Sequence, residues 1–68
     1  MGCTSDVVRA AAGIVESGSP VTVEGISKSW GRSYGSTQRM VRHAVTLGWL
    51  EESTYAPTPA GLEACGRI

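Results

Sequence analysis

Apolar residues recur at helical spacing near the start of the chain. Between residues 7 and 15 they lie three or four positions apart, which places them on one side of a helix. Thr4 or Ser5 can cap this segment, because a side-chain oxygen at a helix start accepts hydrogen bonds from unpaired backbone N–H groups. Gly18 is typical of a helix end. The pattern predicts a helix over residues 5–17.

A second helical pattern follows after a short polar segment. Val23, Ile26 and Trp30 recur at spacings of three and four, and Thr22 is a suitable cap. These residues predict a helix over residues 23–30.

The third pattern predicts a helix over residues 35–47, started by Ser36 or a near neighbour and ended by Gly48. Its apolar residues fall on one side by the 3.6-residue period of the helix. The residues that the same period leaves on the outside are Gln38, Arg39, Arg42, His43 and Thr46.

Residues 49–57 read as two short strands, and they predict a small hairpin. Pro57 confines the second strand to an edge, because proline cannot donate a hydrogen bond to a strand ladder. Thr58 then caps a last helix over residues 59–65. A length of 68 residues allows one domain, which spans residues 1–68. The residues expected in its core are Ile26, Val41, Val45, Leu50 and Leu62, with Trp30 or Trp49 against them.

Charge is unevenly distributed although the formal net charge is zero. The basic residues of the segment 25–48 are Lys28, Arg32, Arg39 and Arg42, and this segment holds no acid. The segments before and after it each hold three acids and one base. This asymmetry points to a nucleic-acid-binding face, and a merely solvated face is the alternative.

The length of 68 residues leaves little room for a substrate cleft. One histidine and the distant cysteines Cys3 and Cys65 offer neither a paired nucleophile and base nor a zinc spacing. We therefore expect no enzymatic activity, no cofactor and no metal. The start of the chain lacks the basic and apolar regions of a signal peptide, and no apolar run approaches a membrane span. We expect a cytoplasmic protein with reduced cysteines.

Three segments of the chain resemble a winged helix-turn-helix domain. Residues 21–31 (VTVEGISKSWG) resemble the first helix of the motif, and residues 36–50 (STQRMVRHAVTLGWL) resemble the recognition helix with the strand after it. Residues 55–61 (YAPTPAG) resemble the exit from the wing in regulators of the multiple-antibiotic-resistance type. The resemblance implies a mainly α fold with a small β-hairpin (α+β): a three-helix core, a short wing and a short C-terminal helix.

Two departures from the family pattern concern the wing. Pro57 stands where the second wing strand usually has an apolar residue, which shortens that strand. Glu51 and Glu52 lie beside the wing, which has no lysine or arginine for DNA phosphates.

The function that the resemblance implies is sequence-specific binding of double-stranded DNA by a small transcriptional regulator, with the third helix in the major groove. Base contacts are expected from one set of residues: Ser36, Gln38, Arg39, Arg42 and His43. A second set would lie near the phosphate backbone: Lys28, Arg32, Ser33 and Tyr34. Arg39 aligns with an arginine that such regulators commonly carry near the start of the recognition helix.

A single module of this kind makes few phosphate contacts, so useful affinity would need a homodimer. The first helix and the last helix are candidate dimer surfaces, the latter through Leu62, Ala64, Cys65 and Ile68. The alternative function is a protein–protein interaction adaptor on the same scaffold, which the zero net charge and the acidic wing favour. A metal sensor is a third interpretation.

Overall fold

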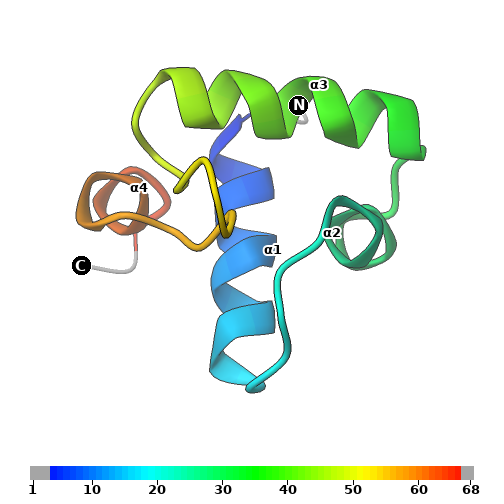
Figure 1. Ribbon diagram of the computed structural model, residues 1–68, viewed down its shortest axis with the longest axis horizontal. Coiled ribbons are helices and arrows are strands. Elements are labelled where there is room, and N and C mark those ends of the chain that lie inside the picture. The colour runs from blue at the N-terminus through cyan, green and yellow to red at the C-terminus, as the bar shows by residue number, and fades with distance from the viewer. Residues whose placement is uncertain (1–3, 67–68) are drawn as a thin grey trace.

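The computed structural model describes residues 4–66, in which four helices surround one short loop (Figure 1). The helices are α1 (Thr4–Glu16), α2 (Val23–Trp30), α3 (Tyr34–Thr46) and α4 (Pro59–Ala64). Each boundary lies within one residue of the range expected from the apolar pattern. Within residues 4–66, no helix is both long and apolar enough to cross a membrane.

α1 is the helix against which the other three pack (Figure 1). Its Val7, Val8 and Ala11 are completely buried. The buried apolar residues that join this stripe come from all the other elements: Val23, Ile26, Val41, Ala44, Leu50 and Cys65. The core is therefore a layer of mostly small aliphatic side chains between α1 and the rest of the chain.

Several apolar residues are more exposed than expected: Val45, expected in the core, is only partly buried and packs against the core cluster, and Leu47 is 45% exposed. Val15 of α1 is 46% exposed, and Leu62 of α4 is only partly buried and does not belong to the core cluster. Both line a shallow hollow of about 210 Å³ together with Pro57. Cys65, one turn after Leu62, takes the buried position instead.

α2 and α3 are joined by a turn of three residues, 31–33. Gly31 has the left-handed φ of 77°, which a residue without Cβ adopts without strain, and its N–H donates to the Ser27 carbonyl at 2.9 Å. In Figure 1, α2 is seen nearly end-on whereas α3 lies across the view, so the two helices cross steeply. The short turn thus places the start of α3 directly after the end of α2.

The predicted β-hairpin over residues 49–57 is wrong. Within residues 4–66 there is no sheet, and the isolated antiparallel bridge in this segment joins Leu50 to Pro57. Tyr55 has a left-handed φ of 59°, which turns the chain out of a strand conformation. Pro57 has no N–H for a further rung, and Thr58 already caps α4. The α+β class with a wing is therefore corrected to a mostly helical domain without a wing.

Close contacts at both ends hold α4 in place. A Cβ added at Gly61 would overlap the carbonyl group of Trp49, so only glycine permits this approach. The N–H of Thr58 donates to the same carbonyl oxygen at 3.0 Å. At the other end, Arg9 Nη2 of α1 donates to the Cys65 carbonyl at 2.9 Å, which places a cation at the negative end of α4.

Gly61→Ala is expected to lower the free energy of unfolding by about 1–3 kcal/mol, because α4 must move away from Trp49 to admit a methyl group. The matched control is Gly13→Ala in α1, where no atom lies within 4 Å of the added Cβ. The control is expected to raise the free energy of unfolding by about 0.5–1 kcal/mol, because alanine favours a helix over glycine. Urea denaturation followed by circular dichroism measures both, and equal stabilities for the two variants would contradict the observed packing of α4.

Candidate nucleic-acid interface

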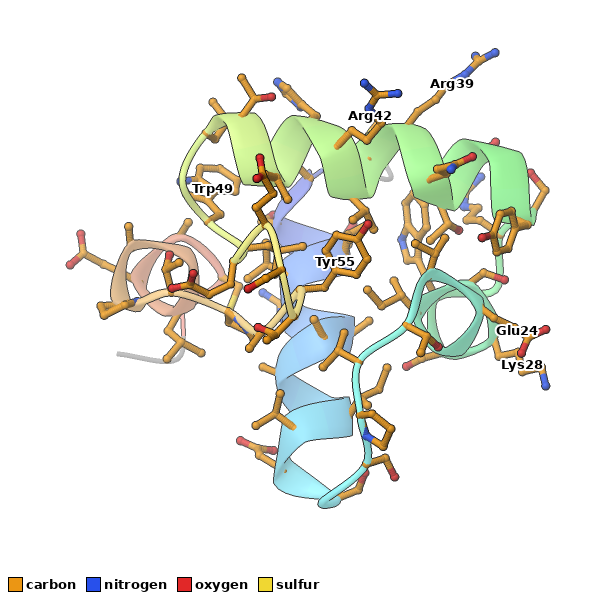
Figure 2. The ribbon with its side chains drawn as sticks, in the orientation of Figure 1. Glu24, Lys28, Arg39, Arg42, Trp49 and Tyr55 are labelled. Carbon is orange, nitrogen blue, oxygen red and sulfur yellow. The ribbon has the colours of Figure 1, made fainter. Side chains whose placement is uncertain are left out.

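The side of α3 that faces away from α1 and α2 is polar. Thr37, Val41 and Ala44 are buried on the inner side. The exposed residues opposite them, here called the outward face, are Ser36, Gln38, Arg39, Arg42, His43 and Thr46. Figure 2 shows Arg39 and Arg42 extending from α3 away from the rest of the molecule. The structure thus brings together on one face the five residues that the sequence suggested for base contacts.

The two arginines at the centre of the outward face have no partner among residues 4–66. Within residues 4–66, neither the Arg39 nor the Arg42 side chain forms a hydrogen bond or an ion pair. α3 itself contains no aspartate or glutamate. Their guanidinium groups therefore retain all their N–H donors for an external acceptor such as guanine or a phosphate.

The four residues expected at the DNA backbone fall into two groups. Arg32, Ser33 and Tyr34 lie at the start of α3, next to the outward face. Lys28 extends from α2 in a different direction from Arg39 (Figure 2). It can therefore contact only a phosphate that passes beside α2.

Arg32 is held against an aromatic ring that the sequence had suggested only for packing. Its guanidinium carbon lies 5.5 Å from the centroid of the Trp30 ring, which is a cation–π distance. Both residues line a hollow of about 270 Å³ that Ser36, Arg39 and Met40 also border. No acidic residue lines this hollow, so two arginines flank a depression beside the first half of α3.

Ser33 caps α3, a role that the sequence analysis had given to Ser36 or a neighbour. Ser33 Oγ accepts a hydrogen bond from the Ser36 N–H at 3.3 Å. The Ser33 carbonyl accepts from the hydroxyl of Thr37 at 2.8 Å, and Thr37 is completely buried. The signal for this cap was a serine just ahead of the apolar stripe. The Ser33 cap fixes the residue at which α3 begins.

The two flanks of the outward face differ in character. On one flank, Gln38 and Arg42 line a hollow of about 390 Å³ together with Glu52 from the loop, which brings an acid to this edge. On the other flank, His43 Nδ1 lies 2.8 Å from Thr4 Oγ1 at the start of α1. Thr4 was expected as a helix cap, but it is the first residue of α1 and its hydroxyl contacts α3.

Among residues 4–66, no group of three or more His, Cys, Asp or Glu side chains could hold a metal ion. Cys65 is buried, whereas Cys3 and Ile68, named in the sequence analysis, lie outside the described residues.

No protein-family model, curated protein or solved structure matches the chain. The geometry of α3 and its surroundings is therefore the evidence that bears on function.

Ser33→Ala is expected to lower the free energy of unfolding by about 1 kcal/mol, because the Ser36 N–H loses its acceptor. Ser33→Asp retains an acceptor oxygen and adds a negative charge at the positive end of α3, so its stability should equal or exceed that of the parent. Ser29→Ala on the exposed side of α2 is the control, with an expected change within about 0.5 kcal/mol. Thermal and urea unfolding measure all three. A loss in Ser33→Asp as large as in Ser33→Ala would show that the hydroxyl does not act as a cap.

Proposed function

We propose that this chain is a helix-turn-helix domain that binds double-stranded DNA sequence-specifically, with α3 in the major groove, and that it acts as a small transcriptional regulator. One observation carries the proposal: the outward face of α3 presents Arg39 and Arg42 without partners among the described residues. The major groove, about 12 Å wide, admits an α-helix. There an arginine can donate two hydrogen bonds to O6 and N7 of guanine, which reads a base rather than the backbone.

The surroundings of α3 support this orientation. With α3 in the groove, the turn 31–33 lies beside the DNA backbone, where Arg32 can bind a phosphate. The first turn of α3 contains no acid, so the positive end of its dipole also favours a phosphate. The acids of the described residues lie on the other elements: Asp6, Glu16, Glu24, Glu51, Glu52 and Glu63. A chain of zero net charge can therefore present a cationic side to DNA.

A homodimer forms part of the proposal, because two copies double the number of phosphate contacts. The hollow that Val15, Pro57 and Leu62 line between α1 and α4 is mainly apolar, with Glu16 as its charged residue, and it does not involve α3. Its burial between two copies would leave both outward faces free. The described residues extend 27 Å along their longest axis. This extent is on the scale of one DNA turn, about 34 Å, which separates the half-sites that a dimeric helix-turn-helix protein contacts.

A protein–protein interaction adaptor is the second candidate function. The observation that favours it is an open hollow of about 770 Å³ between the segment before α2, the start of α3 and the loop. Its lining includes the apolar side chains of Tyr34, Tyr55, Val15 and Val21, and Glu24 is its charged residue. An extended peptide with apolar side chains would fit this lining.

Titration of genomic DNA fragments against the protein at two salt concentrations separates the two candidates. If the protein is a DNA-binding regulator, some fragments should bind tightly near physiological salt, and the affinity for all fragments should fall as the salt concentration rises. Absence of DNA binding near physiological salt would exclude the regulator and leave the adaptor, whose partner should be lost when Tyr55 in the lining of the 770 Å³ hollow is changed.

Arg39→Ala is expected to cost about 1–3 kcal/mol of binding free energy on the preferred site and much less on random DNA, because a bidentate base contact provides that much discrimination. Lys28→Ala should weaken binding to all sequences alike and reduce the salt slope by about one unit, as the loss of one phosphate contact would. Fluorescence anisotropy with labelled duplexes at several salt concentrations measures both effects.

The matched control for this experiment is Arg39→Lys, which keeps the positive charge but loses the planar pair of donors. It should retain the salt slope of the parent and lose the preference for the selected site. If Arg39→Ala and Lys28→Ala both bind DNA as the parent does, the regulator function fails.

A further inference from the structure

We propose that Thr4 sets the tautomer of His43, so that α3 offers DNA a hydrogen-bond acceptor that selects bases with an amino group in the major groove. The base-contacting residue is His43, and Thr4 is a positioning residue that acts through it. The tautomer follows from contacts within the protein, whereas the base selection rests on the proposed function.

The contacts join the start of α1 to one flank of the outward face. Thr4 Oγ1 lies 2.8 Å from His43 Nδ1 and 3.7 Å from Met40 Sδ. Thr4 is buried, with 8% of its surface exposed, whereas His43 is exposed. One edge of the imidazole is therefore tied to α1, while the ring as a whole remains accessible to a ligand.

A count of protons assigns the tautomer. A threonine hydroxyl has one proton to donate and two lone pairs that accept, and a thioether sulfur only accepts. Thr4 can satisfy both contacts only if its hydroxyl donates a hydrogen bond to Met40 Sδ and its oxygen accepts one from the Nδ1–H of His43. In the other tautomer Nδ1 would need the same hydroxyl proton, and the contact with sulfur would lose its hydrogen. The arrangement with more hydrogen bonds therefore places the His43 proton on Nδ1.

The consequence lies on the opposite edge of the ring. A neutral imidazole that is protonated on Nδ1 carries a bare lone pair on Nε2, which accepts and cannot donate. In the major groove the donors are the amino groups of cytosine N4 and adenine N6, while guanine offers only acceptors on its O6 and N7. His43 lies one helical turn after Arg39. The outward face thus combines arginine donors that suit guanine with one acceptor that suits cytosine or adenine.

Nuclear magnetic resonance of the free protein tests the tautomer without DNA. His43 is the only histidine in the sequence, so a ¹⁵N–¹H correlation of the imidazole needs no further assignment. When the ring is neutral, the parent should show its proton on Nδ1. A spectrum with the proton on Nε2 in the parent would overturn the proposal.

Three variants test the role of Thr4 by the same spectrum. Thr4→Val keeps the shape but removes the hydroxyl, and the proton should move largely to Nε2, whereas Thr4→Ser should restore the parent spectrum. The matched control is Thr46→Val, because the Thr46 hydroxyl bonds only to the Arg42 carbonyl on its own helix. An unchanged His43 spectrum in folded Thr4→Val would overturn the role of Thr4. The parent spectrum tests the tautomer even if Thr4→Val fails to fold.

Selection of binding sites from random duplexes tests base reading. The parent and Thr4→Ser should select cytosine or adenine at one position, and replacing that base should weaken binding about tenfold, within the range of one good base contact. Thr4→Val should lose this preference while its salt dependence stays that of the parent. If Thr4→Val selects the same bases as the parent, the reading role is overturned. If no variant binds DNA, the proposed function fails together with base reading, while the tautomer is judged by the imidazole spectra alone.

Discussion

The packing of α3 onto α1 decides which side of α3 is left for a ligand. The completely buried Val7 and Val8 of α1 share one core with Val41 and Ala44 of α3. A rotation of α3 by one residue, about 100°, would expose this stripe and turn an arginine toward the core. An unpaired guanidinium in an apolar core costs several kcal/mol, so the register is strongly favoured. The constraint that builds the core therefore also directs Arg39 outward.

Hydrogen bonds at the turn between α2 and α3 add to this constraint. Gly31 ends α2 in a left-handed conformation, and Ser33 starts α3 by accepting from the Ser36 N–H. The buried hydroxyl of Thr37 donates to the Ser33 carbonyl, which ties the inner side of α3 to its first residue. These local bonds fix both the start of α3 and its rotation, and with them the positions of Arg32 and the outward face.

The sequence predicts those parts of the structure that depend on periodicity and local capping. The 3.6-residue pattern was sufficient to place α1, α2 and α3 and to leave Gln38, Arg39 and Arg42 outside. The prediction of a hairpin is wrong because residues 49–57 resemble strands in residue type but not in backbone conformation. Tyr55 in a left-handed conformation and Pro57 without an N–H leave room for a single bridge.

Other features could not be predicted because they join residues that are far apart in the chain or depend on side-chain geometry. The contact between Thr4 and His43 spans 39 positions, and no periodic pattern relates the two. The stacking of Arg32 on Trp30 depends on how the chain turns at Gly31, which a stripe of apolar residues does not describe. The close approach at Gly61 depends on where the loop places the Trp49 carbonyl.

We propose the outward face of α3 as the surface that binds DNA. Titrating ¹⁵N-labelled protein with a selected duplex, followed by amide chemical shifts, tests it residue by residue. If α3 binds DNA, the shifts should concentrate in the turn and in α3, over residues 31–46, with small changes in α4 and at the end of α1 near Val15. Shifts confined to α4 and the hollow beside Val15, or no shifts at all, would contradict it.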